Sequence, residues 1–224
     1  DSVPHDWLMK CLGVRIEDPS LMRLVARFLK SGVMEEGKLL ATEIGTPQGG
    51  NLSPVLSNIF LHYVLDLWFE KKVKPTLKGY SRYCRFADDF VACFERQDEA
   101  EAFGALLRER LAKFGLKVSE KKSRILEFGR TAWKKHQQGG NKVATFDFLG
   151  FTHYCDKTRK GAFKLGRKTS SKKLRAKLTA ANLWLKSIRN VTKLTNWWPV
   201  FQAKLRGHYY YYGVSGNMRE LKAF

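Results

Sequence analysis

The feature that most constrains the fold is residues 83–94, YCRFADDFVACF, where two apolar runs flank a pair of adjacent carboxylates. Both runs are rich in aromatic and small apolar residues, which is typical of mostly buried strands. Aspartate tolerates turn geometry better than most residues, so we expect a tight hairpin that turns around Ala87 and Asp88. The hairpin would carry both carboxylates at its tip.

Two adjacent carboxylates are costly to bring together unless a cation neutralises them. An isolated Asp-Asp pair is most often a solvated turn, and this is the alternative interpretation. Here Asp88 and Asp89 lie between apolar strands, in a chain with a formal net charge of +20 at pH 7. This setting favours a divalent-metal site that serves a polyanion.

The positive charge is concentrated toward the C-terminus, since residues 157–219 contain 16 Lys or Arg and no Asp or Glu. This asymmetry predicts a boundary near Asp156, with one domain over residues 1–156 and a basic domain over 157–224. Nucleic acid is the first candidate partner, and a membrane surface is the alternative partner.

No apolar run reaches membrane-spanning length. The four cysteines are scattered, which favours a cytoplasmic protein without structural disulfides or zinc.

The helical spacing of apolar residues predicts several helices. They are expected after Pro4, from Asp18 to about Ser31, from Ser53 to about Phe69, from Asp98 to Gly115, from Ser170, and from about Thr195. Asp98 is predicted to cap its helix, with Glu101 completing a capping box.

Strands are expected over 38–44, 116–118, 124–128 and 146–151, the last one paired with 163–165. Residues 131–142 are expected to form a mobile polar loop.

The loop over 45–54 is dense in Gly and Pro, which lets a backbone approach a ligand closely. It lacks the spacing of a Walker loop or a dinucleotide fingerprint, so plain turn chemistry is its alternative.

In the C-terminal part, basic residues surround an apolar helical stripe, and tryptophans and tyrosines follow over 197–212. Such a mixture suits contact with phosphates and with bases or sugars. Core packing is the alternative for the aromatic residues. For a basic face without any acidic residue, a binding surface is favoured over a solvated one.

Taken in order, these stretches resemble the reverse transcriptases encoded by group II introns and their bacterial relatives. FADD over 86–89 resembles the family's Tyr-Ala-Asp-Asp box, with Phe86 in place of the usual tyrosine. TPQGG over 46–50, followed by LSP over 52–54, resembles its template- and nucleotide-contacting loop and helix. Lys122 falls where the family has a lysine near the leaving pyrophosphate.

Two further stretches extend the resemblance over nearly the whole chain. FLGF over 148–151 resembles the primer-gripping hairpin, and the basic segment that ends with LRGHYYYYG over 205–213 resembles the thumb, or maturase region. The implied fold is α+β: a right-hand polymerase palm, an antiparallel sheet with packed helices, followed by a helical thumb. Because the chain begins late, the fingers are expected to be largely absent, and so is the family's first metal-binding Asp; such an N-terminally truncated chain is expected to be inactive alone.

The resemblance implies two-metal nucleotidyl transfer onto a primer 3′-hydroxyl, with Mg²⁺ as the cofactor. Asp88 and Asp89 would be catalytic metal ligands, and Lys122 would act at the pyrophosphate. The implied nucleotide- and template-binding residues are Pro47, Gln48, Gly49, Phe86 and Ala87. The implied primer grip is Leu149 and Gly150, and the implied contacts to the nucleic-acid backbone are Lys168, Lys172, Lys173, Arg175 and Arg206.

The implied partners are an RNA template, the RNA/DNA duplex, deoxynucleoside triphosphates and intron RNA, with no membrane. One alternative is an RNA-binding maturase that assists splicing without polymerising; the Asp-Asp tip speaks for polymerase ancestry, because RNA binding alone does not need it. A weaker alternative is a reverse transcriptase that serves host defence or mutagenic retrohoming.

Overall fold

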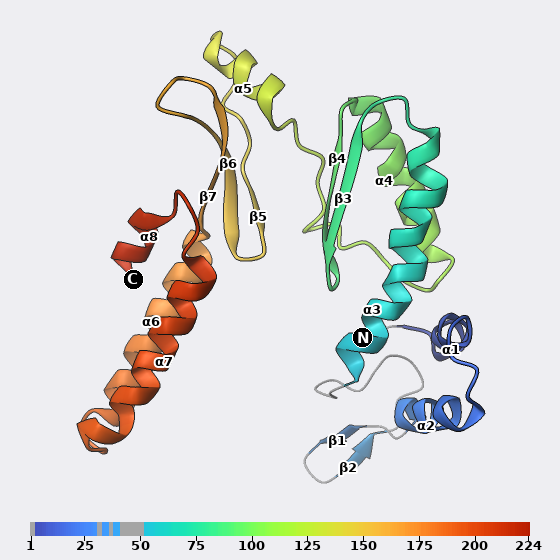
Figure 1. The fold of residues 1–224 in the computed structure, drawn as a ribbon, viewed down its shortest axis with the longest axis horizontal. Helices are drawn as coiled ribbons and strands as arrows, with labels where there is room; N and C mark the ends of the chain where they lie inside the picture. The colour runs from blue at the N-terminus through green and yellow to red at the C-terminus, as the bar shows by residue number, and fades with distance from the viewer. Residues whose placement is uncertain (1–2, 31–32, 36–37, 41–51) are drawn as a thin grey trace. The chain divides into compact units, whose positions relative to one another are not determined.

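The computed structural model describes residues 3–30, 33–35, 38–40 and 52–224. By packing, the chain divides into two compact units, Asp1–Ile125 and Leu126–Phe224 (Figure 1). The boundary near Asp156 was inferred from charge, which is a different property from packing, and it stays a prediction. Among the described residues, no helix is both long and apolar enough to cross a membrane.

The first unit is built from helices that pack against a two-stranded hairpin. Its helices are α1 (His5–Gly13), α2 (Pro19–Lys30), α3 (Ser53–Leu61) and α4 (Gln97–Ala112). Its strands form two antiparallel pairs, β1 (Val33–Glu35) with β2 (Lys38–Leu40) and β3 (Ser81–Phe86) with β4 (Asp89–Phe94). Beyond α3 the helical path continues through π-helical turns at His62–Asp66 and Phe69–Val73 and a 3₁₀ turn at Lys74–Thr76.

Aromatic packing joins this long helical segment to the hairpin. Phe69 is fully buried, and its ring stacks on Tyr83 of β3 with centroids 5.0 Å apart. Phe103 of α4 meets the edge of Phe69 at 5.6 Å and lies 5.1 Å from Phe94 of β4. A two-stranded hairpin alone is marginally stable in water, so the aromatic packing stabilises β3 and β4.

The second unit is a three-stranded antiparallel sheet followed by helices. Its strands lie in the order β5 (Phe146–Phe148), β6 (Phe151–Lys157), β7 (Phe163–Thr169). Its helices are α5 (Arg130–Gln137), α6 (Ser171–Ile188), α7 (Leu194–Tyr212) and α8 (Met218–Ala223). Figure 1 shows α6 and α7 side by side, and Trp184 of α6 stacks on Phe201 of α7 at 6.3 Å.

Buried polar contacts fasten the end of the sheet to the end of α7. Asn217 is fully buried; its Oδ1 accepts from the Thr169 backbone N–H at 2.8 Å, and its Nδ2 donates to Thr169 Oγ1 at 2.8 Å and to the Tyr212 carbonyl at 2.9 Å. One side chain therefore satisfies groups from both β7 and α7, as buried polar atoms require.

Three local predictions were wrong. Residues 116–118 and 124–128 are not strands: no described strand pairs with them, and Leu116 and Val118 pack on the helical core instead. Residues 131–142, expected to be a mobile loop, begin with helix α5, because Ala132 is buried and Trp133 packs on Phe163 at 6.0 Å.

The capping box predicted for α4 is also wrong. The N-cap is Arg96 rather than Asp98, and no side chain caps this helix. Asp98 instead accepts two hydrogen bonds from the Arg96 guanidinium, at 3.1 and 2.9 Å. Glu101 accepts from Gln97 at 2.8 Å. The acidic residues thus serve surface pairs within the first turn of the helix.

Replacing Asn217 by Ala should destabilise the second unit by roughly 2–4 kcal/mol, because buried groups of β7 and α7 would lose their partner. Hydrogen exchange of the β7 amides, followed by mass spectrometry, measures this loss. The matched control is Asn182→Ala, on the exposed surface of α6, which should leave exchange unchanged. Equal exchange in both variants would refute the role of Asn217.

Candidate functional site

The predicted hairpin is confirmed, and its turn is where the sequence placed it. Phe86 pairs with Asp89 across the strands, so Ala87 and Asp88 form a two-residue turn. Ala87 has φ 53°, a left-handed conformation that costs a residue with a Cβ free energy. Something outside the turn must therefore hold it.

Arg85 supplies that restraint. Its Nε and Nη2 donate to the two carboxylate oxygens of Asp66, each at 2.7 Å, and its Nη1 donates to Asn58 Oδ1 at 2.8 Å and to the Ala87 carbonyl at 2.7 Å. The Arg85 side chain is only 9% exposed. A planar guanidinium suits this geometry, because it presents parallel donors to a carboxylate and keeps others for the backbone.

The electrostatics around this ion pair favour fixed charges. Hydrogen bonding to Asp66 raises the pKa of Arg85 further above its already high value. Burial raises the pKa of Tyr83 well above its usual range, and the negative charge of Asp66 adds to this rise. Arg85 therefore stays charged and Tyr83 stays neutral at any physiological pH.

The two carboxylates at the tip are exposed to solvent. Among the described residues, the side chains of Asp88 and Asp89 form no hydrogen bond or ion pair, and no three His, Cys, Asp or Glu gather into a possible metal site. Magnesium is commonly held by one or two carboxylates together with waters and substrate phosphates. Two unpaired carboxylates on a rigid turn fit that donor set.

The other site residues predicted for the first unit lie in three different segments. Pro47, Gln48 and Gly49 lie outside the described residues. Phe86 ends β3 with its ring 64% exposed, directly beside the tip. Lys122 lies in a tight turn where its backbone N–H donates to the Ser119 carbonyl at 3.0 Å, and its side chain is exposed.

In the second unit, Leu149 and Gly150 form the turn between β5 and β6. Both have positive φ, 50° and 78°. Tyr211 of α7 donates its hydroxyl to the Leu149 carbonyl at 2.8 Å, and the Ser170 N–H donates to the Gly150 carbonyl at 2.9 Å. A Cβ at Gly150 would lie 2.8 Å from the Tyr212 hydroxyl, so this turn needs both the glycine and the tyrosines beside it.

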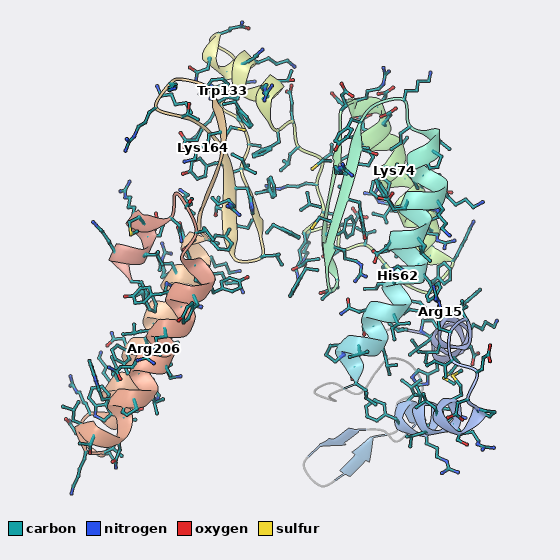
Figure 2. All side chains as sticks on the ribbon, viewed as in Figure 1. Arg15, His62, Lys74, Trp133, Lys164 and Arg206 are labelled. Atoms are coloured by element: carbon teal, nitrogen blue, oxygen red, sulfur yellow. The ribbon has the colours of Figure 1, made fainter. Side chains whose placement is uncertain are left out.

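The predicted backbone-binding cations all belong to the second unit. Lys168 is half-buried, with its ammonium group 5.8 Å from the centre of the Tyr154 ring. Lys172, Lys173 and Arg175 are exposed in the first turns of α6. Arg206 projects from α7 (Figure 2). The N-terminus of a helix carries partial positive charge. The three cations at the start of α6 are therefore repelled by this charge and by one another, and a nearby anion would relieve the repulsion.

Sequence reasoning missed the clamp that positions the tip. The signal was Arg85 itself, a charged residue inside an apolar run at a strand position that faces the helix. Its partner Asp66 lies 19 residues earlier, and no spacing rule connects the two.

The model of the family described as reverse transcriptase (RNA-dependent DNA polymerase) matches residues 1–153. The chain belongs to the reverse transcriptase family. The Asp88-Asp89 hairpin and the sheet through His153 lie within this match, whereas α6 and α7 lie beyond it.

Individual relatives support the same family. The group II intron-encoded protein LtrA of Lactococcus lactis subsp. cremoris is 38% identical over 74 residues, 33% of this chain and 12% of that protein. An uncharacterized 91 kDa protein in the cob intron of Schizosaccharomyces pombe is 40% identical over 79 residues, 35% of this chain and 10% of its own length. Protein YkfC of Escherichia coli is 34% identical over 116 residues, 41% of this chain and 30% of that protein. The matches thus span less than a third of each relative.

Replacing Arg85 by Gln should destabilise this member of the reverse transcriptase family by roughly 2–3 kcal/mol, because the partly buried Asp66 would lose both guanidinium hydrogen bonds. Asp66 would keep only its longer contact with His62, whose Nδ1 lies 3.4 Å from Asp66 Oδ2. Urea unfolding followed by tryptophan fluorescence measures the change. Arg82→Gln is the matched control: Arg82 is exposed on the same strand and should change stability little. A loss of equal size in both variants would show that Arg85 is not a clamp.

Proposed function

We propose that this chain contains the palm and thumb of an RNA-directed DNA polymerase, which extends a primer on an RNA template. The observation that carries the proposal is the pair of exposed, unpaired carboxylates of Asp88 and Asp89 at a clamped hairpin tip, in a member of the reverse transcriptase family. The first unit would supply the palm, and α6 and α7 would supply the thumb.

Asp88 and Asp89 would hold Mg²⁺, with water and substrate phosphates among the remaining ligands. When bound, divalent ions activate a primer 3′-hydroxyl and stabilise the leaving pyrophosphate. Arg85 holds the backbone of the turn that carries both carboxylates, which would lower the cost of organising the site when substrate arrives. Lys122 would neutralise the pyrophosphate or donate a proton to it.

The remaining roles concern substrate and duplex. Pro47, Gln48 and Gly49 would line the nucleotide and template side, together with the exposed ring of Phe86 and the strained backbone of Ala87. The turn at Leu149 and Gly150 would contact the primer through its backbone, held in place by Tyr211.

The cations of α6 and α7 would hold the duplex through its phosphates. Lys172, Lys173 and Arg175 share the positive end of α6, so bound phosphate would relieve their mutual repulsion. Lys168 and Arg206 would add contacts from β7 and α7. Such contacts fix position without reading sequence. The proposed nucleic acids are an RNA template, its hybrid duplex with DNA, and an intron RNA.

The second candidate function is that of a maturase that binds intron RNA without polymerising. It is favoured by the relatives, two of which are named as intron proteins, and by the basic helices α6 and α7, whose binding of RNA does not need the hairpin. Primer extension separates the two functions.

Replacing Asp88 by Asn keeps the shape of the side chain and removes its charge. In a longer protein that also carries the family's first metal-binding Asp, we expect Mg²⁺-dependent extension of a DNA primer on an RNA template to fall by about 10²-fold or more, the scale seen when one electrostatic stabiliser is removed. Affinity for RNA, measured by filter binding, should be nearly unchanged. The control is Asp98→Asn, an exposed carboxylate on α4, which should extend the primer normally.

Undiminished extension by the Asp88→Asn variant would refute the metal-site assignment. Tight RNA binding without any extension in Mg²⁺, both by this chain and by the longer protein, would instead favour the maturase function.

A further inference from the structure

Helix α5 and the turn between β6 and β7 carry a second concentration of positive charge, apart from α6 and α7. Residues 128–146 and 157–169 contain no Asp or Glu. The exposed cations of this part are Arg130, Lys134, Lys135, Lys142, Lys157, Arg159, Lys160, Lys164 and Arg167. Residues 131–142 were expected to form a mobile loop, so the sequence assigned the basic residues of α5 to no surface.

Specific contacts hold α5 against the sheet. The Trp133 ring meets the edge of Phe163 at 6.0 Å, and the Cys155 thiol donates to the Gly129 carbonyl at 3.7 Å. Phe163 pairs with Lys157 at the end of the strands, next to the turn. The helix and the turn therefore belong to one packed surface, and their charges cannot move apart.

The β6–β7 turn is itself well ordered by hydrogen bonds. The Thr158 N–H donates to the Ala162 carbonyl at 2.8 Å, the Gly161 N–H donates to the Thr158 carbonyl at 2.9 Å, and the Ala162 N–H donates to Thr158 Oγ1 at 3.1 Å. Arg159 and Lys160 occupy the corner and are exposed. Cations on a preorganised turn lose less conformational entropy when they bind a ligand.

Most of these cations have no counterion within the part of the chain that the structure describes. Lys135 pairs with Glu127 at 2.6 Å. Arg130, Lys134, Arg159 and Lys160 form no ion pair among the described residues. Unpaired like charges concentrated on one surface destabilise the folded chain, and a polyanion would reverse that effect.

This surface lies at the far end of the sheet from the thumb helices. Strand β7 runs from Phe163, beside the turn, to Thr169, and α6 begins at Ser171. Seven residues of strand span roughly 20 Å at the usual rise. Figure 1 shows α5 and the pair α6–α7 at opposite ends of the three strands. Roughly 20 Å exceeds the screening length of about 10 Å at 0.1 M salt, so the two surfaces act as separate sites.

We propose that α5 and the β6–β7 turn form a second site for the sugar–phosphate backbone of RNA, which holds a segment of the strand beyond the one gripped by α6 and α7. The proposal rests on the proposed function only in taking RNA as the polyanion. Its chemistry is that of Arg and Lys on phosphate, and the contacts of Trp133 with Phe163 leave that ring to packing rather than to base stacking. The site would therefore bind without regard to sequence.

The test is the variant Lys134→Gln/Arg159→Gln/Lys160→Gln, with its affinity for a long stem-loop RNA measured over a range of salt concentrations. We expect the slope of log affinity against log salt to flatten by about 2 to 3, and the affinity near 0.1 M salt to fall by roughly 10- to 100-fold, since three phosphate contacts are lost.

A charge-matched control guards against a general effect of lowered net charge. Lys71→Gln/Lys72→Gln/Lys78→Gln removes three positive charges from an exposed part of the first unit, where Glu70 lies nearby in sequence. This control should keep the slope of the unaltered protein. Thermal unfolding of both variants should match that of the unaltered protein, because none of the six side chains forms an ion pair among the described residues.

A third variant, Lys172→Gln/Lys173→Gln/Arg175→Gln, tests the thumb contact of the proposed function by the same assay. Because the surfaces lie far apart, the losses of the two triple variants should add when they are combined. If the α5 variant matches the control while the α6 variant loses affinity, the second site is wrong and the thumb contact stands. If only the α5 variant loses affinity, the second site stands and the thumb contact is wrong. If the α5 variant keeps its RNA slope but loses binding to polyglutamate, the surface takes an acidic protein segment and the proposal is wrong.

Discussion

The ion pair between Arg85 and Asp66 is the interaction on which the candidate metal site depends. It joins the strand end beside the tip to the helical segment that continues from α3, and the same guanidinium holds the carbonyl of Ala87. A two-residue turn with a left-handed alanine would otherwise be free to rearrange. Arg85 is already paired with Asp66 and does not neutralise Asp88 or Asp89, so the charges of these two carboxylates are available to the proposed metal.

In the second unit, neutral side chains rather than an ion pair hold a turn and a strand end in place. Asn217 links β7 to the end of α7, and Tyr211 links the β5–β6 turn to the same helix. His208 of α7 is buried, and neither of its ring nitrogens forms a hydrogen bond with a residue that the structure describes. Its ring stacks on Phe224 with centroids 3.6 Å apart, and burial lowers its pKa. The end of the sheet and the end of α7 therefore form one packed body, which can present a backbone turn and basic helices in a fixed relation within this unit.

Local patterns in the sequence predicted much of this arrangement. The hairpin tip, α1 and α2 follow from apolar runs with turn residues between them. The single strand expected over 146–151 was wrong: Leu149 and Gly150 form a turn there, and residues 163–165 pair with 155–157 rather than with 146–151. The clamp does not, because Asp66 faces Arg85 only through a π-helical turn that has no sequence signature. Helix α5 was missed because its polar composition resembles a loop; only the contact of Trp133 with Phe163, a tertiary interaction, makes it a helix on the sheet. The contact of Trp133 with Phe163 also brings the cations of α5 and of the β6–β7 turn onto one surface.

The most direct test of the central claim is to locate a bound divalent ion. Manganese broadens the nuclear magnetic resonance signals of nearby amides, and it can be titrated into the protein in the presence of an RNA–DNA duplex and a deoxynucleoside triphosphate. The account predicts that broadening is centred on residues 86–90 at the hairpin tip and that Mg²⁺ in excess reverses it. Broadening centred elsewhere, with the signals of Asp88 and Asp89 unaffected, would contradict it.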